Sequence, residues 1–215
     1  MVKRGLTRDA LVAFAHEYVT ANGLDALTMR RVAATAGVTS GALYKHFEDR
    51  KDLQRAMADA VWATIDLSDI DTATPSVAQV MTCCHRMRQA MLGFRDGGRI
   101  VAGTYAPLAA TLKLSATLMA LLGAITKPDY SPGQIATLLR SYTTGFVIDE
   151  QAFLELAASN EWDALVQQIA DAGHRRTADT DDLIAVLTGD RDQRFATGLD
   201  MILTGLVRSG PAPRG

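Results

Sequence analysis

Residues 27–47 constrain the fold more than any other part of this 215-residue chain, because they read as two short helices joined by a glycine turn. Thr28 can cap the first helix, whose apolar side chains recur with the 3.6-residue period of an α-helix. Gly37 then supplies a residue that can adopt a positive φ, and Thr39 or Ser40 can cap the second helix. The pattern predicts a helix-turn-helix unit.

The second helix of this unit is expected to keep its bulky apolar side chains inside and to present small and polar ones. Leu43 and Phe47 fall on the face toward the core, and the opposite face carries Ser40, Gly41, Tyr44 and Lys45. Small residues at the start of such a helix allow it to approach base edges in a DNA major groove. The same spacing also fits a purely structural helical hairpin, so spacing alone leaves both interpretations open.

The order of residues in this unit resembles the N-terminal domain of the TetR family of transcriptional regulators. The similarity lies in the Leu27-Thr28 opening, the Ala-x-x-x-Gly-Val turn that ends at Val38, and the Leu-Tyr-Lys-His-Phe segment that ends at Phe47. It implies a DNA-binding regulator that reads a palindromic operator as a homodimer. It also implies that nine residues lie at DNA-contact positions: Thr28, Arg30, Ser40, Gly41, Ala42, Tyr44, Lys45, His46 and Arg50.

Side-chain chemistry separates the roles within this implied set. Arg30 is the best candidate for base reading, because a guanidinium can make two hydrogen bonds to guanine. Lys45 could read a base or hold a phosphate, and the other polar members suit phosphate contacts, which position a protein without specifying sequence. Gly41 and Ala42 offer small apolar contacts, for instance to thymine methyl groups.

Charge is distributed unevenly along the chain, whose net charge is −2. Residues 1–55 hold nine Lys and Arg against six Asp and Glu, a balance of +3, whereas residues 56–215 hold 13 against 18, a balance of −5. The basic part coincides with the helix-turn-helix unit. This asymmetry favours a small DNA-reading head on an acidic body.

The rest of the chain is helical by pattern, which predicts an all-α protein of two domains. A helix from about Thr7 to Ala21 completes a three-helix head at residues 1–49. A helix over 50–66 connects this head to the body, a ligand-binding and dimerisation domain that spans residues 50–215. Other helices are expected over 76–94, 107–125, 131–159, 182–187 and 190–208, with a short turn or helix before Gly103, a polar loop at 171–182 and a disordered tail at 209–215.

The helices expected at 131–159 and 190–208 carry more apolar surface than one core can use. The two helices are therefore expected to pair with their copies in a second chain and to form a four-helix bundle at a two-fold dimer interface. The alternative, that both are central helices of a single core, stays open.

The body resembles the C-terminal domain of the tetracycline-repressor branch of the family, with the similarity concentrated in residues 94–104 and 141–151. In that branch a histidine on the short helix helps to hold the magnesium ion of the drug chelate, and an arginine follows the next threonine. The corresponding residues here are Val101 and Tyr105, and valine offers no lone pair to a metal ion. The resemblance therefore implies a small, largely apolar effector, uncharged or weakly polar, other than magnesium–tetracycline.

The same resemblance places eight residues around this effector: Cys83, Met87, Met91, Val101, Thr104, Tyr105, Leu108 and Leu118. Each of them also has a core-packing interpretation, because Met and Leu at helical spacing are what any helical core uses.

Two alternatives to a ligand-responsive regulator are an all-α small-molecule binding protein and a redox or metal sensor that uses Cys83 and Cys84. The sensor is disfavoured because neighbouring side chains diverge around a helix and the chain has no third cysteine. We find no acid–base cluster, nucleophile cluster or His-Glu-x-x-His motif, so no enzyme, catalytic residue, metal site or cofactor is predicted. We expect a cytoplasmic protein, because the sequence shows no signal peptide and no apolar run of ~18 residues to span a membrane.

Overall fold

The computed structural model describes residues 7–172 and 178–206, and every regular element within these ranges is helical, as predicted. The elements in chain order are α1 (Arg8–Asn22), the 3₁₀ helix η1 (Leu24–Ala26), α2 (Met29–Thr35), α3 (Ser40–Leu43), α4 (Arg50–Ala63), α5 (Val77–Leu92), α6 (Gly97–Val101), α7 (Ala109–Ile125), α8 (Pro132–Ala158), α9 (Trp162–Ala172), α10 (Ala178–Thr188) and α11 (Arg191–Leu206).

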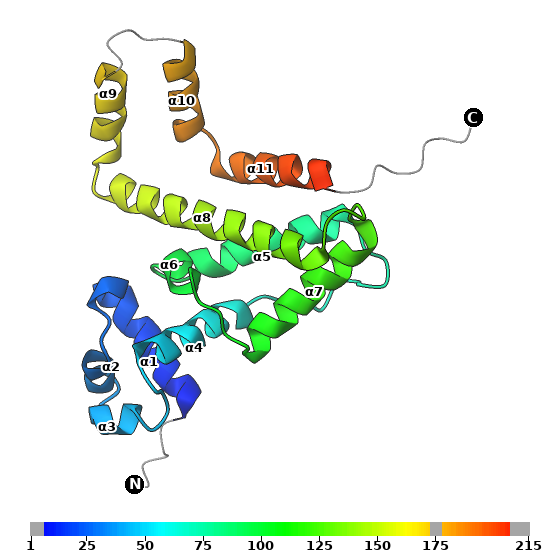
Figure 1. Cartoon of the computed structure of the whole chain (residues 1–215). Coiled ribbons are helices and arrows are strands. Elements are labelled where there is room, and N and C mark those ends of the chain that lie inside the picture. Colours follow the sequence, from blue (N-terminus) through cyan, green and yellow to red (C-terminus); the bar gives the residue numbers. More distant parts are fainter. Residues whose placement is uncertain (1–6, 173–177, 207–215) are drawn as a thin grey trace.

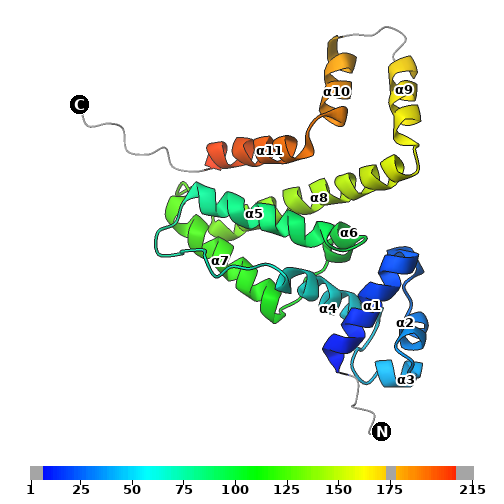
Figure 2. The same cartoon turned by 180° about the vertical axis from the view of Figure 1, so that it is seen from behind.

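The helices form a small head and a larger body, as Figure 1 shows. Helices α1, α2 and α3 make the head, and α4 leads from the head into the body. In the body α5, α6 and α7 pack against the long helix α8, and α11 returns along α8. Helices α9 and α10 project from the far end of α8 (Figure 2). No helix in the described ranges is long and apolar enough to cross a membrane.

The helices of the head begin where the sequence predicts, because each has a side-chain cap. Thr7, Thr28 and Thr39 accept a hydrogen bond from the backbone N–H three residues later at the starts of α1, α2 and α3. Asp49 does the same for α4. The head core then closes around Leu43 and Phe47, both almost fully buried.

A buried ion pair joins three helices of the body. Arg88 of α5 donates two hydrogen bonds to Glu150 of α8, at 2.7 and 2.6 Å, and one at 2.6 Å to Asp192 of α11. Arg88 and Glu150 are both buried, so breaking one member would leave the other as an unpaired charge. The pair fixes how α5, α8 and α11 meet.

The structure differs from the sequence-based expectation at several helix boundaries. Helix α3 is one turn long and α4 ends at Ala63, short of residue 66. Helix α9 is not predicted at all, and α10 begins at Ala178, within the expected loop at 171–182. That loop is wrong where the chain is described, because 171–172 and 178–182 are helical. The tail expected at 209–215 lies outside the described residues.

Candidate DNA-binding face and ligand cavity

One face of the head, formed by α2 and α3, presents most of the residues placed at DNA-contact positions. Thr28 and Arg30 are exposed at the start of α2, and Gly41, Tyr44 and Lys45 are exposed on or just after α3. The side chains of Ser40, Ala42 and His46 are half-buried between them. In the described ranges no carboxylate pairs with Arg30 or Lys45, so both cations are available to an outside anion.

Local geometry fixes this face against the core. Gly37 has a φ of +67°, which turns the chain between the two helices, and Val38 N–H then donates to Ala33 O at 2.9 Å. Leu43 and Phe47 anchor the far side of α3 in the core. Because these two side chains are fixed in the core, the opposite, exposed side of α3 is held in a defined orientation.

Two arginines of the head are already engaged inside the protein. Arg8 lies over the ring of Phe47, with 4.2 Å between its guanidinium carbon and the ring centroid, and pairs with Asp52 at 2.8 Å. The hydrogen bond from Arg8 lowers the pKa of the Asp52 carboxyl. Arg50 donates to Leu24 O at 3.3 Å, which directs it toward η1 and away from the other candidate contacts.

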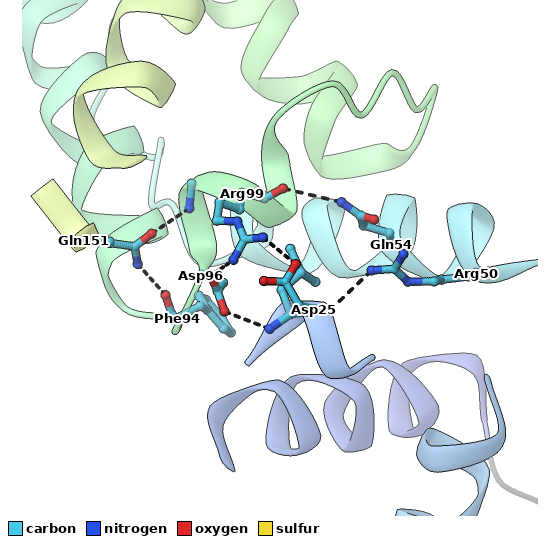
Figure 3. A network of polar contacts seen from close by, with 9 residues as sticks. Asp25, Arg50, Gln54, Phe94, Asp96, Arg99 and Gln151 are labelled. Carbon is cyan, nitrogen blue, oxygen red and sulfur yellow. Dashed lines mark hydrogen bonds and ion pairs between the residues drawn. The ribbon is translucent and has the colours of Figure 1, made fainter. Parts of the chain in front are cut away.

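A polar network joins the head to α6 of the body (Figure 3). Asp96, which caps α6 with a φ of +58°, accepts a hydrogen bond from Leu24 N–H at 2.8 Å. Arg99 bridges the two parts by pairing with Asp25 of η1 at 2.6 Å and with Asp96 at 2.8 Å. The first turn of α6 is therefore bonded directly to the head.

The opposite side of α6 is bonded to α4 and α8. Gln54 of α4 donates to the carbonyl oxygens of Arg99 and Ile100 at 3.4 and 3.3 Å. Gln151 of α8 accepts from Gly98 N–H at 3.0 Å and donates to Phe94 O at 2.8 Å. A displacement of α6 would therefore change contacts with the head, the connecting helix and the body together.

A cavity of about 250 Å³ lies in the body between α4, α5, α7 and α8. Its apolar lining includes two buried side chains from α4 and α5, Trp62 and Met87. Helices α7 and α8 supply the other lining residues: Thr111, Leu114, Ser115, Leu118, Met119, Gly133, Ala136, Thr137 and Arg140. Its lining combines buried apolar side chains with four polar residues of α7 and α8, Thr111, Ser115, Thr137 and Arg140, which we call the polar wall. Such a mixture is typical of a small-molecule site.

The eight residues that the resemblance places around an effector do not gather at this cavity. Met87 and Leu118 line it, whereas Cys83, Met91 and Val101 are packed in the core. The Thr104 hydroxyl donates to Val101 O at 2.6 Å and Leu108 is half-buried. Tyr105 is 76% exposed and lies beneath Arg140.

Sequence reasoning missed the polar wall of the cavity. A usable signal was present, because Thr111 and Ser115 are four residues apart on one helix and Thr137 and Arg140 three apart on another. Neither pair could be assigned to a cavity without knowing that α7 and α8 pack together.

The two cysteines are free and buried. Burial raises the pKa of Cys83 to about 11 and that of Cys84 to about 12, so both are thiols at neutral pH. In the described ranges no group of three or more His, Cys, Asp or Glu side chains could hold a metal ion. These observations argue against a redox or metal sensor at this position.

Comparison with known proteins gives matches to both parts of the chain. Residues 11–57 match the family model described as bacterial regulatory proteins, tetR family, and residues 75–209 match the tetracyclin repressor-like C-terminal domain. A curated relative, the tetracycline repressor protein class C of Escherichia coli, is 30% identical over 209 residues, which cover 94% of this chain and 91% of the relative.

Solved structures match over nearly the whole chain. A possible TetR family transcriptional regulator from Streptomyces coelicolor A3(2) superposes with a TM-score of 0.76 at 28% identity, over 93% of this chain and 98% of that one. The Streptomyces coelicolor TetR family protein ActR in complex with actinorhodin superposes with a TM-score of 0.75 at 25% identity, over 95% and 96% of the two chains.

Proposed function

Because the chain belongs to the TetR family of bacterial transcriptional regulators, we propose that it is a repressor that binds a palindromic operator as a homodimer and is released by a small, largely apolar organic effector. It is a DNA-binding regulator and not an enzyme. The observation that carries the proposal is the exposed face of α2 and α3, where Arg30 and Lys45 have no carboxylate partner in the described ranges. We place its action in the cytoplasm, where operator DNA lies.

The proposed DNA contacts divide into one base reader and a set of supporting contacts. Arg30 reads a base, most simply guanine, and Lys45 reads a base or holds a phosphate. Thr28, Tyr44 and His46 hold phosphates, and Ser40, Gly41 and Ala42 keep the start of α3 small enough to enter a major groove. Arg50 is also proposed to hold a phosphate, because its side chain is exposed and its hydrogen bond to Leu24 O leaves other N–H donors for an anion. We infer that the DNA-binding head ends at Asp49, the N-cap of α4, and that the ligand-binding and dimerisation domain begins with α4.

The proposed dimer uses the exposed apolar side chains of α8 and α11. A groove of about 810 Å³ runs between α8, α9, α10 and α11, and its lining includes Phe146, Phe153, Trp162 and Met201. A second copy of the chain would cover this groove and complete a four-helix bundle from two copies of α8 and α11. Two heads on one two-fold axis then read two half-sites.

The proposed release mechanism runs through α6. An effector in the 250 Å³ cavity touches α4, α5, α7 and α8, and α6 is bonded to α4, α8 and the head. Ligand binding would favour an arrangement of these helices in which the heads no longer match the operator spacing. A ligand can do this only to the extent that it binds the released arrangement more tightly.

The first test is selection of the full-length protein on random duplex DNA, followed by footprinting. The expected result is a palindrome with half-site centres ~34–36 Å apart or at a multiple of that distance. A non-palindromic footprint would contradict the proposal that a two-fold dimer binds the DNA. The absence of any sequence preference would contradict the proposal that the protein recognises a specific operator.

A second test assigns the base reader on the selected site. Arg30→Ala should weaken binding roughly 5- to 150-fold and relax the preference at one position of each half-site, because one bidentate contact contributes ~1–3 kcal/mol. Lys113→Ala is the control, since it removes an exposed cation from α7 of the body. Equal affinities for the two variants would remove Arg30 from this role.

A further inference from the structure

We propose that the effector of this protein is an organic anion: a compact, two-ring-sized apolar body with one acidic group, a carboxylate or its equivalent, which pairs with Arg140. This inference rests on the proposed effector cavity and adds a charged group to the apolar ligand expected from the sequence. Arg140 lies at the polar wall of that cavity, on α8.

Within the described ranges the charge of Arg140 has no counterion. Three other arginines of the body and the junction are paired: Arg86 with Asp69, Arg88 with Glu150, and Arg99 with Asp25, all at 2.6 Å. Arg95, Arg191 and Arg194 form no ion pair within the described ranges either, but they do not line this cavity. No carboxylate in the described ranges lies within ion-pair distance of Arg140. A half-buried guanidinium at a cavity wall is therefore matched by a ligand and not by the chain.

The contact that Arg140 does make preserves its capacity to bind an anion. Its guanidinium carbon lies 5.3 Å from the centroid of the Tyr105 ring, over the ring. This contact attracts the cation without supplying a counter-charge, and a guanidinium carries N–H donors that can form two parallel bonds to a carboxylate. Tyr105 thus restricts Arg140 without neutralising it.

A carboxylate that contacts one of the cavity-lining residues is already bonded within the protein. Asp59 of α4 accepts hydrogen bonds from Thr111 N–H and from the Thr111 hydroxyl, both at 2.7 Å, and so binds the start of α7. It is not among the residues that line the cavity. The lining therefore carries one positive charge and no negative one.

The rest of the cavity sets the size and polarity of the body of the ligand. Trp62, Met87, Leu114 and Leu118 are buried side chains that form an apolar floor. The volume of about 250 Å³ is below the ~300–1,000 Å³ of sites for drug-sized ligands, which favours a compact body such as two fused rings. Ser115 and Thr137 add hydroxyl groups along the same wall as Arg140.

The test compares two probes of one shape that differ in charge, 2-naphthoate and 2-naphthamide. Calorimetric titration of the full-length protein should show naphthoate binding at least ten-fold more tightly than the amide. Arg140→Gln should remove this preference by weakening naphthoate binding at least ten-fold while changing amide binding less than two-fold. Arg140→Lys should retain part of the preference. The control Lys113→Gln, which removes another exposed cation of the body, should leave both affinities unchanged.

Met119→Trp separates failure of this inference from failure of the cavity. Met119 is 43% exposed at the cavity, so a larger side chain there blocks the site without disturbing the core. If both probes bind the wild type equally and Met119→Trp abolishes both, the effector cavity stands and the anionic effector is overturned. If the charge preference survives in Arg140→Gln, or if neither probe binds at millimolar concentration, the proposal is also overturned, while operator selection still decides the regulator function.

Discussion

Gly41 is a residue for which the fold and the proposed DNA contact make different demands. Its backbone does not adopt a positive φ, and the atom nearest to a Cβ built at this position is the Thr39 hydroxyl oxygen at 3.9 Å. The fold therefore has room for a side chain there. A glycine within a helix costs about 0.5–1 kcal/mol relative to alanine, so its presence on the exposed side of α3 is consistent with the proposed close approach of this helix to DNA.

Replacement of Gly41 separates these two roles. Gly41→Leu is expected to leave the free energy of unfolding unchanged or to raise it by up to about 1 kcal/mol, because leucine is the better helix former. Operator affinity is expected to fall at least ten-fold, because the added side chain would clash with the base edges in the major groove. Thermal denaturation and gel-shift titration measure the two quantities. Wild-type affinity in a stable Gly41→Leu variant would show that this end of α3 does not enter the groove.

His16 gives the head–body junction a dependence on pH. It is buried, its Nε2 lies 3.2 Å from Met57 O, and its ring centroid is 4.5 Å from that of Phe94. Burial lowers its pKa below the ordinary value of 6.5, so the folded protein binds this proton less readily than the unfolded chain. Stability is then complete above pH ~6.5 and falls as the pH decreases below that value.

Chemical denaturation between pH 7 and pH 5 tests this expectation. The wild type should lose free energy of unfolding with a slope of up to about 1.4 kcal/mol per pH unit from this group, the limit for one proton. His16→Gln should lose less over the same interval, whatever its absolute stability. If the free energy of unfolding had the same pH dependence in both proteins, the pKa of His16 would be the same in the folded and unfolded states, and the prediction would be wrong.

Individual side chains differ in how far the sequence reveals them. Thr28, Thr39 and Gly37 are predictable because caps and positive-φ turns act through residues only a few positions away. Arg88 and Glu150 are 62 positions apart, and no local pattern pairs them. The cavity wall is hidden for the same reason. What depends on helix packing could not be read from local sequence.

Helix α6 is an element whose position depends on the absence of a side chain. A Cβ built at Gly97 would collide with Met91 O at the end of α5, and one at Gly98 would lie 2.9 Å from the Ile148 side chain of α8. Glycine at both positions lets this five-residue helix sit against α5 and α8. The sequence predicts a turn or short helix here. The close contacts of Gly97 and Gly98 with α5 and α8 explain why α6 has a defined position.

The pair between Arg99 and Asp25 tests whether α6 holds the head in place. Both side chains are largely exposed, so Arg99→Gln should change the melting temperature little. Operator affinity should fall several-fold, because the heads lose one fixed contact that sets their spacing. Arg86→Gln is a matched control, since it removes another exposed arginine–aspartate pair at 2.6 Å between α5 and the linker before it.

A double-mutant cycle makes the Arg99 experiment specific. If the contact itself matters, Asp25→Asn with Arg99→Gln should weaken operator binding no more than either single change. Additive losses would instead indicate that the two side chains act separately, for example through independent contacts with phosphates.

The sequence predicts a helix well where its apolar face packs into the core of the chain, and poorly where its apolar side chains stay exposed. Helices α1, α5, α7 and α8 lie close to the ranges that their periodicity predicts, and α1, α5 and α8 also begin at a side-chain cap. Helix α9 was missed and α10 was placed too late, and both project from the body with exposed apolar side chains such as Leu165 and Val186. They contact each other, and α9 contacts the end of α8, but in the described ranges they contribute no residue to the buried core, so a search for the apolar face of a single core does not find them.

At the scale of the whole molecule, the described residues leave an apolar groove uncovered along α8 and α11, and this groove is the subject of the last prediction. Leu154 is 51% exposed and Met201 is 72% exposed, and Met201 lines the groove together with Phe146 and Trp162. In a single chain, Met201→Glu places a carboxylate in water and should not affect folding. In a two-fold dimer the same change occurs twice, and each unpaired charge buried at the interface costs about 3–5 kcal/mol.

Sedimentation therefore distinguishes a working dimer from a monomer. The wild type at micromolar concentration should sediment with twice the mass of one chain and Met201→Glu with the mass of one. The monomer should also bind its operator much more weakly, because two linked heads raise each other's effective concentration at the half-sites. Leu112→Glu, at an exposed leucine of α7 outside the groove, should remain dimeric. A Met201→Glu variant that stays dimeric would place the subunit contact elsewhere, and the groove would need another occupant.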